Sequence, residues 1–175
     1  VHLRRQRQMC IRDSLCALPA AAEQPFSLGG EITVTKVSDG DSLRSGQLKI
    51  RLHGIDAPEL KQDCADASGR RWPCGAAARE RLVELTSAPL KCDLVDVDRF
   101  GRLIMRCLSG DADIAETLVL QGLALAYRRY STDYVRAEEA ARRKRAGVWK
   151  GEFMAPWDWR LSLIHISEPT RRALI

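Results

Sequence analysis

No part of the 175-residue sequence contains the roughly 20 consecutive apolar residues that a membrane-spanning helix needs. There is no Cys-x-x-Cys pair, which argues against a structural zinc site. Internal repeats and low-complexity runs are also missing. We therefore expect a protein without a membrane-spanning helix, a zinc ribbon or a repeat array, and its length is that of one domain.

The two ends of the chain do not resemble protein sequence. Arg4–Ser14 reads RRQRQMCIRDS and Leu161–Arg171 reads LSLIHISEPTR. Codons for the second segment, read on the opposite strand in another frame, give the Met-Cys-Ile-Arg-Asp of the first. Both segments therefore resemble translated sequencing-adapter DNA, and we predict that residues 1–14 and 161–175 are adapter-derived artefacts. A genuine basic arm and a genuine apolar tail are the alternative.

Without these ends, the chain has almost no net charge and few histidines. The full chain has 28 basic and 23 acidic residues, a formal net charge of +5. Without residues 1–22 and 161–175 it keeps 22 basic and 21 acidic residues, so net charge gives no argument for binding nucleic acid. His53 is then the one remaining histidine, which excludes sites built on paired histidines.

Residues 15–22, LCALPAAA, are apolar and end in three alanines before Glu23. Small residues at such positions are typical of a signal-peptide cleavage site. We therefore predict a truncated signal-peptide remnant and a secreted or periplasmic protein, whose mature domain spans residues 23–160. An Ala-rich leader without this role is the alternative.

The mature region combines strand-like and helical patterns. Alternating apolar residues predict strands at 31–37, 43–44, 47–53, 90–97 and 103–108. Helical spacing predicts three helices at 75–86, 114–120 and 133–145, with Asp113 able to cap the second. Five strands with a helix between the third and fourth are the order of an OB-fold barrel. We therefore predict an α+β protein that is mainly a five-stranded β-barrel, with three helices.

The chain is organised around one stretch, VSDGDSLRSGQLKIRLHGIDAPEL. Alternation in its strand LKIRLH puts the leucines and the isoleucine on one face and Arg51 on the other. Asp41 precedes this strand, and Asp56 and Glu59 follow it, so carboxylates at the two ends of a hairpin can meet beside Arg51. Hard oxygen ligands next to a fixed guanidinium suit a calcium ion and a phosphate. A solvated hairpin with acidic turns is the alternative.

Five motifs along the chain resemble the staphylococcal nuclease (thermonuclease) family in order and spacing. Within that family the chain resembles the secreted bacterial members that have four cysteines. They are VSDGDSL, IRLHGIDAPE, DRFGR, LVLQGLALAY and AEEAARRKRAGVW. The resemblance covers residues 31–149 and implies an OB-fold with two further helices after the barrel. It also implies a calcium-dependent enzyme that hydrolyses DNA and RNA with little sequence preference and leaves 3′-phosphate ends.

The resemblance further implies the residues of a metal and phosphate site. Asp41, Asp56 and the backbone carbonyl of Ala57 would bind Ca²⁺, which prefers oxygen ligands, and Asp39 would support them in the turn. The family's best-known member has Thr at the position of Ala57, but a carbonyl ligand does not depend on the side chain.

Catalysis and substrate binding are assigned in the same way. Glu59 matches the family's general base or water-positioning residue, and Arg51 and Arg102 match its two phosphate-binding arginines. Arg99 and Tyr127 match positions that contact nucleotide phosphate, although Arg99 replaces a more usual Lys.

Four cysteines remain outside the ends and the signal-like segment: Cys64, Cys74, Cys92 and Cys107. If Asp98–Gly101 is a turn, residues whose numbers sum to 199 face each other across it, as Cys92 and Cys107 do. We predict that these two form one disulfide and that Cys64 and Cys74 close a polar loop with another. Free thiols and a zinc site are the alternatives.

These expectations converge on a monomeric Ca²⁺-dependent nuclease. One rival is a noncatalytic nucleic-acid-binding OB-fold module. Such a module would lack some of the carboxylates or arginines, whereas this sequence has the expected residue at all five positions. A second rival is a calcium-binding module, which would have no use for Arg51 and Arg102 beside its acids.

Overall fold

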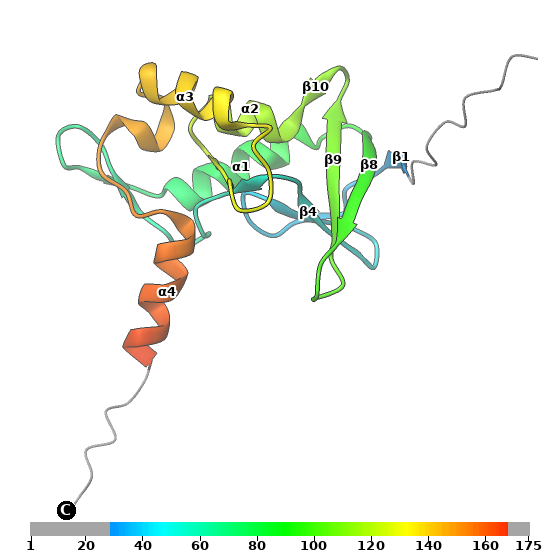
Figure 1. The fold of residues 1–175 in the computed structure, drawn as a ribbon, viewed down its shortest axis with the longest axis horizontal. Coiled ribbons are helices and arrows are strands. Elements are labelled where there is room, and N and C mark those ends of the chain that lie inside the picture. Colours follow the sequence, from blue (N-terminus) through cyan, green and yellow to red (C-terminus); the bar gives the residue numbers. More distant parts are fainter. Residues whose placement is uncertain (1–28, 168–175) are drawn as a thin grey trace, which may run out of the picture.

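The structure is a computed structural model that describes residues 29–167. The predictions for residues 1–14 and 15–22 lie outside the described residues, as does the part of the predicted C-terminal artefact beyond residue 167. In Figure 1 the strands of the main sheet lie on one side of the molecule and most of the helices on the other. Within the described part, no helix has both the length and the apolar character needed to cross a membrane.

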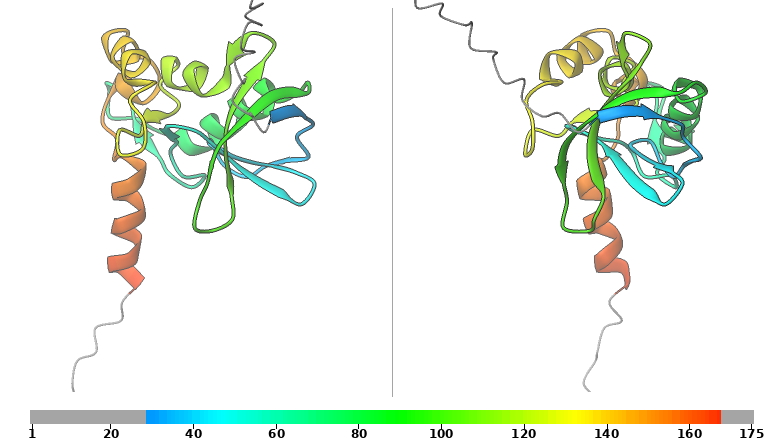
Figure 2. Two further views of the ribbon diagram at one scale, coloured as in Figure 1. Left: turned by 45° about the vertical axis from the view of Figure 1, so that its right-hand side comes forward. Right: turned by 90° about the vertical axis from the view of Figure 1, so that its right-hand side faces the viewer.

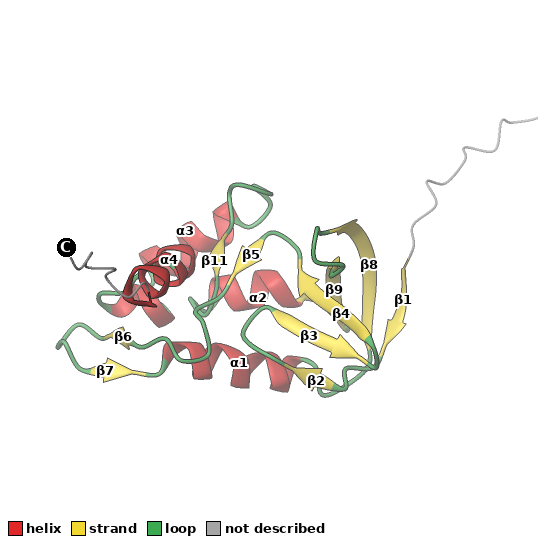
Figure 3. Cartoon of the chain, turned by 90° about the horizontal axis from the view of Figure 1, so that it is seen from below, coloured by secondary structure: helices red, strands yellow, loops and turns green. Residues whose placement is uncertain are grey.

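One seven-stranded sheet forms the barrel, in the order β1-β8-β9-β4-β3-β2 with β10 added beside β9. The strands are β1 (Gly29–Ile32), β2 (Lys36–Val37), β3 (Ser42–Ser45), β4 (Leu48–Leu52), β8 (Leu90–Val97), β9 (Leu103–Ser109) and β10 (Ala112–Asp113). All neighbours are antiparallel except β4 and β9, which are parallel. Figure 3 shows these strands gathered at one end of the molecule.

The sheet has to curl because its two edge strands are neighbours in the sequence. β1 pairs with β8 at one edge and β2 pairs with β3 at the other, yet only residues 33–35 separate them. Three residues can span at most roughly 14 Å, so the two edges must approach each other. The predicted single strand 31–37 is therefore wrong in its continuity, because the segment bends and serves both edges. Counted as one bent strand, it completes the five strands of an OB-fold, which confirms the predicted fold.

The β8–β9 hairpin carries the predicted disulfide. Cys92 faces Cys107 in the register and their sulfur atoms are bonded. The register shifts between Leu94 and Asp96, so that Val97 faces Leu103 beyond the bulge. The connecting loop is consequently one residue longer than the predicted turn, and the extra residue of the bulge restores the pairing further along. Cys64 and Cys74 form the second predicted bond.

Three helices confirm the sequence pattern within a few residues. They are α1 (Cys74–Leu85), α2 (Ile114–Leu120) and α3 (Val135–Arg143), and a 3-10 turn η1 (Gly147–Lys150) follows. The Asp113 carboxylate accepts hydrogen bonds from the N–H groups of Ala115 (2.8 Å) and Glu116 (3.1 Å), so the predicted cap is present. The apolar faces of the helices bury Leu82, Ile114 and Leu118 completely.

A fourth helix, α4 (Pro156–Ser167), was not predicted. Its first turn has the features of a helix start, with Pro156 at its first position and Asp158 nearby. Because residues 161–175 were set aside as artefact, too little of the pattern remained to indicate a helix. Residues 161–167 continue α4 in the structure.

Two apolar clusters hold the fold together. The larger fills the barrel and reaches the helices, and includes Leu43, Ile50, Leu52 and Leu90, each at most 1% exposed. Leu48, which alternation places on the same face of β4 as Ile50 and Leu52, is 50% exposed. The smaller cluster joins the disulfide of Cys64 and Cys74 to Val148 and the aromatic residues Trp72, Trp149, Phe153 and Trp157.

The smaller cluster sits around two short two-stranded sheets that lie beside the barrel. One pairs β5 (Ile55–Asp56) with β11 (Leu125–Ala126), and the other pairs β6 (Cys64–Ala65) with β7 (Arg71–Trp72). Figure 2 shows that the tip of the β8–β9 hairpin and α4 project from the body in the same direction. The surface between these projections includes the segment that the sequence marks as the candidate site.

Breaking the disulfide of Cys92 and Cys107 with a double Cys→Ser substitution should lower the free energy of unfolding by about 3 kcal/mol, the chain-entropy value for a loop of this size. Urea denaturation of the variant and the parent measures the difference. Thiol counting provides the control, because the unreduced, denatured full chain should show at most the two thiols of Cys10 and Cys16. Four reactive thiols would contradict one of the two bonds, and six would contradict both.

Candidate active site

Arg51 binds two carboxylates at once. It leaves β4 and donates to Asp41 Oδ1 through Nη1 (3.0 Å) and to Asp56 Oδ1 through Nη2 (2.6 Å). Its Nη2 also lies 2.8 Å from Asp41 Oδ2. The exposed fractions of the side chains are 16% for Arg51, 4% for Asp41 and 0% for Asp56. Carboxylates from the two ends of the hairpin therefore meet beside Arg51, as the alternation of the strand suggested.

A glycine lets the loop that carries Asp41 approach closely. A Cβ at Gly40 would lie 2.7 Å from the Cβ atoms of both Ala57 and Ala78, so only glycine fits between the β5 turn and α1. Asp41 Oδ2 accepts a hydrogen bond from the N–H of Ala57 (3.2 Å), which ties the loop to the second carboxylate segment. Asp39 accepts from the N–H of Asp41 (3.2 Å) and so shapes the turn.

Burial and neighbouring cations have opposite effects on the pKa values of the two buried acids. Burial raises the pKa of Asp41, and Arg51 opposes this increase without cancelling it. Burial likewise raises the pKa of Asp56, against hydrogen bonds and charge from Arg160 and Arg51. Burial disfavours the charge of Arg51, but Asp41 and Asp56 outweigh it and raise the pKa of the guanidinium. The centre therefore concentrates negative charge that needs positive charge beside it.

Glu59 is held by a tight turn next to these acids. Its N–H donates to Gln62 Oε1 (3.2 Å), and its carbonyl accepts from the N–H of Gln62 (2.7 Å). A Cβ at Gly75 would lie 1.7 Å from the Glu59 carbonyl oxygen, so the first turn of α1 packs directly on this backbone. The Glu59 side chain is 34% exposed, unlike that of the fully buried Asp56.

Arg160 of α4 is a member of the site that the sequence interpretation missed. Its Nη2 donates to Asp56 Oδ2 (2.6 Å), and its Nη1 donates to Asp56 Oδ1 (3.2 Å) and to Glu59 Oε1 (2.7 Å). Burial disfavours the charge of Arg160, but the hydrogen bonds to Asp56 and Glu59 prevail and raise the pKa of its guanidinium. No sequence motif marked Arg160, because it lies beyond the residues that carry the family resemblance.

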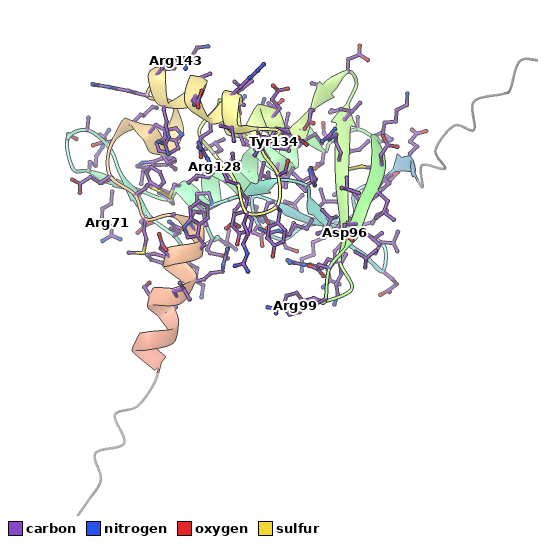
Figure 4. The ribbon with its side chains drawn as sticks, in the orientation of Figure 1. Arg71, Asp96, Arg99, Arg128, Tyr134 and Arg143 are labelled. Atoms are coloured by element: carbon purple, nitrogen blue, oxygen red, sulfur yellow. A yellow bond between two sulfur atoms is a disulfide. The ribbon has the colours of Figure 1, made fainter. Side chains whose placement is uncertain are left out.

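Arg102 and Arg99 belong to the β8–β9 loop and do not contact the acids. Arg102 donates through Nε to Asp98 Oδ2 (2.7 Å) within that loop. It directly precedes Leu103, the partner of Ile50 on β4, so the start of β9 brings Arg102 alongside the strand that carries Arg51. Arg99 lies at the tip of the hairpin in Figure 4, with its guanidinium 4.8 Å from the Phe100 ring centre.

Tyr127 lies near Asp56, on the segment that follows the strand paired with β5. It follows β11, whose Leu125 pairs with Asp56, and its N–H donates to the Gly54 carbonyl (2.9 Å). Its ring stacks on Trp157 of α4 with 5.5 Å between centres. A pocket beside it is lined by further aromatic and basic side chains, including Arg128, Arg142 and Trp149. Figure 4 shows Arg128 near the centre of this face of the molecule.

The donors suited to a metal ion are oxygens. Among residues 29–167, no group of three His, Cys, Asp or Glu side chains is arranged as a metal cage. Asp41 and Asp56 nevertheless present two buried carboxylates that already share one cation, and the Ala57 backbone adjoins them. Such hard oxygen donors fit Ca²⁺, provided that water completes the coordination shell.

Fold and site together define a class of protein. An OB-fold barrel that gathers buried carboxylates, a partly exposed glutamate and guanidinium groups has the chemical groups needed to hydrolyse a phosphodiester. A family profile described as "Staphylococcal nuclease homologue" matches residues 49–151.

Curated proteins similar to the chain include bacterial and plant members. The succinoglycan biosynthesis protein ExoI of Rhizobium meliloti (strain 1021) is 31% identical over 140 residues, which cover 76% of this chain and 69% of that protein. The probable staphylococcal-like nuclease CAN2 of Oryza sativa subsp. japonica is 32% identical over 124 residues, covering 69% of this chain and 31% of that protein. An uncharacterized endonuclease of Escherichia coli O157:H7 is 29% identical over 136 residues, covering 73% and 82%.

The chain belongs to the staphylococcal nuclease family. It spans about a third of the length of the rice relative. Relatives named as nucleases or endonucleases support a nuclease function, and the two disulfides point to an oxidising compartment.

Replacing Asp41 with Asn should raise the free energy of unfolding at pH 7 in metal-free buffer, because burial penalises the ionised carboxylate in the folded state. A raised folded-state pKa contributes stability that is present below the unfolded pKa and lost as pH rises through the folded pKa. The advantage of the variant should therefore shrink as the pH falls toward the ordinary aspartate value of 3.8.

Urea denaturation at pH 7 and pH 4 measures this change in stability. The exposed Asp111, changed to Asn, is the matched control and should leave the midpoint nearly unaltered. An Asp41→Asn variant that is less stable than the parent at pH 7 would show that burial does not dominate at this position.

Proposed function

We propose that the protein is a secreted or periplasmic calcium-dependent nuclease that hydrolyses DNA and RNA with little sequence specificity and leaves 3′-phosphate ends. The observation that carries this proposal is the joint contact of Arg51 with Asp41 and Asp56, one turn away from Glu59. A structural hairpin would have no reason to bury two carboxylates, since their desolvation costs stability.

The reaction requires an aligned water molecule and a phosphate whose growing negative charge is neutralised. Glu59 is the general base or water-positioning group: its carboxylate is partly exposed while its backbone is fixed by Gln62 and Gly75. The water oxygen bonds to phosphorus as the P–O5′ bond breaks, and the phosphate remains on the 3′ side. Arg51 and Arg102 donate to the phosphoryl oxygens, where planar guanidinium groups can bind two oxygens together.

Asp41, Asp56 and the Ala57 carbonyl would hold Ca²⁺, with Asp39 fixing the turn that presents Asp41. Bound calcium would supply positive charge beside the phosphate and favour ionisation of a coordinated water. For Arg102 to take part, its guanidinium has to turn from Asp98 toward Arg51, and both leave neighbouring strands.

Arg99 and Tyr127 are the proposed outer contacts of the nucleic acid. Arg99 projects at the hairpin tip, and Tyr127 stacks against Trp157 beside a pocket that also presents Arg128. Aromatic rings and arginines near each other suit single strands, because bases stack and backbone phosphates pair with guanidinium groups. Residues 23–160 are the proposed nuclease domain, acting as a monomer, and residues 1–14 and 161–175 the proposed artefact.

Calcium dependence is expected to be complete. The purified protein should degrade single-stranded DNA and RNA with Ca²⁺ and leave them intact when a chelator is added. The DNA fragments should not prime a polymerase until a phosphatase removes their 3′-phosphates. Intact nucleic acid in both conditions, together with binding in a filter assay, would instead favour the noncatalytic OB-fold module.

Glu59→Gln should lower kcat by about 10²-fold or more while leaving nucleic-acid binding nearly unchanged, because Gln keeps the shape but cannot accept a proton. Arg51→Lys should cost a similar factor, since Lys cannot bind two oxygens in a plane. Gel-based kinetics with saturating Ca²⁺ measure both. Glu80→Gln, an exposed change on α1, is the matched control. A Glu59→Gln enzyme within threefold of the parent would remove Glu59 from the mechanism.

A further inference from the structure

The carboxylate of Asp56 has a guanidinium on every oxygen. Arg51 reaches Oδ1 at 2.6 Å, and Arg160 reaches Oδ1 at 3.2 Å and Oδ2 at 2.6 Å. The same Arg160 Nη1 also binds Glu59 Oε1 at 2.7 Å. Arg160 therefore spans two acids that have separate tasks in the proposed reaction, one in metal binding and one in handling water.

Arg160 is delivered to this position by a well-anchored segment. Gln62, fully buried, donates through Nε2 to the Met154 carbonyl (2.6 Å), so the residue that holds the Glu59 turn also holds the approach to α4. The Glu152 carbonyl accepts from the N–H of Ala65 (2.8 Å). One turn before Arg160, Trp157 stacks on Tyr127. The contact of Arg160 with the acids therefore follows from the packing of the fold.

We propose that Arg160 is an active-site residue that acts as an internal counter-ion and exchanges with the divalent cation: it neutralises Asp56 and Glu59 in the free protein and leaves Asp56 when the metal binds. The proposal rests on the proposed calcium dependence. Ca²⁺ on Asp56 would compete with Arg160 for Oδ2, to which Arg160 alone donates among the side chains described here, and a positive charge that stays nearby lowers the affinity for Ca²⁺.

Arg160, and not Arg51, is the group that can leave. Arg51 is 16% exposed and is also bound to Asp41, so releasing it would uncover a second buried acid. Arg160 is 39% exposed and extends from the second turn of α4 on a long flexible stem, so its guanidinium can turn into solvent. Release would also free Glu59 Oε1, which Arg160 otherwise occupies. Metal binding would thereby prepare the glutamate for its water.

Calorimetric titration of Ca²⁺ into the full chain, without nucleic acid, tests the exchange. Arg160→Gln keeps much of the stem and removes the charge, and it should bind Ca²⁺ about tenfold more tightly than the parent, the effect of one unit charge at about 6 Å even in water. Arg160→Lys keeps the charge and should change affinity less. Arg143→Gln, which removes the same charge from α3 far from α4 in Figure 4, should match the parent within about twofold.

A second measurement needs no folded charge-removal variant. In ¹⁵N-arginine NMR of the parent, with the signal assigned by its loss in Arg160→Lys, the Arg160 Nη resonances should show hindered rotation without metal and averaged rotation at saturating Ca²⁺. Unchanged Arg160 signals at saturation, or a folded Arg160→Gln protein whose Ca²⁺ affinity equals or falls below that of the parent, would overturn the exchange.

These outcomes are separate from those that test the proposed function. A parent enzyme that cleaves DNA with Ca²⁺, but whose affinity is insensitive to Arg160→Gln, keeps the nuclease assignment and loses the exchange. Tighter Ca²⁺ binding by Arg160→Gln in a protein that cleaves nothing supports the exchange and removes the nuclease assignment.

Discussion

The burial of two carboxylates against one guanidinium is the constraint on which the arrangement of the chain depends. Asp41 and Asp56 are almost completely withdrawn from water, and burial raises the pKa of each. A fold tolerates such a pair only when cations are held at hydrogen-bond distance. The β4 strand fixes the first cation, Arg51, and the close-packed turns at Gly40 and Gly75 keep the acids from drifting apart. The site is thus built into the scaffold and not placed on a mobile loop.

The barrel and the smaller apolar cluster contribute different parts of this centre. The curled sheet presents Arg51 and, through the parallel pairing of β4 with β9, brings the loop of Arg102 to the same side. The smaller cluster, closed by the bond between Cys64 and Cys74, supports the segment that presents Arg160. The acids lie where the two parts meet. Electrostatic need and packing therefore act on the same few residues.

Local patterns were enough to predict most of the barrel, and their failures have physical causes. Alternation in β4 and the spacing of α2 gave the right elements because both lie half buried, with one apolar face. The pairing of Cys92 with Cys107 was also right, although its premise of a four-residue turn was not: a bulge at the base of the loop compensated for the longer connection. The bend between β1 and β2 could not be read, since it depends on the curl of the whole sheet.

The candidate site was predictable only in its first half. Four of its residues are close in sequence: Asp41, Arg51, Asp56 and Glu59. A single hairpin can bring them together, so their proximity could be predicted from the sequence. Arg160 is distant from them, and its place depends on tertiary anchoring through Gln62 and Trp157 that no periodicity encodes. The resemblance that identified the other residues ends before Arg160.

The covalent link between Cys64 and Cys74 has a consequence for the candidate site. Cys74 is followed directly by Gly75, whose backbone supports the carbonyl of Glu59, and Cys64 adjoins the residue that fixes Glu152. Both disulfides are buried, with Cys64 at 3% exposure and Cys74, Cys92 and Cys107 at 1% or less, so the fold shields both bonds from a reductant. Once broken, the bond between Cys64 and Cys74 would loosen both supports. Loss of this bond would therefore act on the backbone that positions Glu59 and on the approach to α4, whereas loss of the bond between Cys92 and Cys107 would act on the barrel.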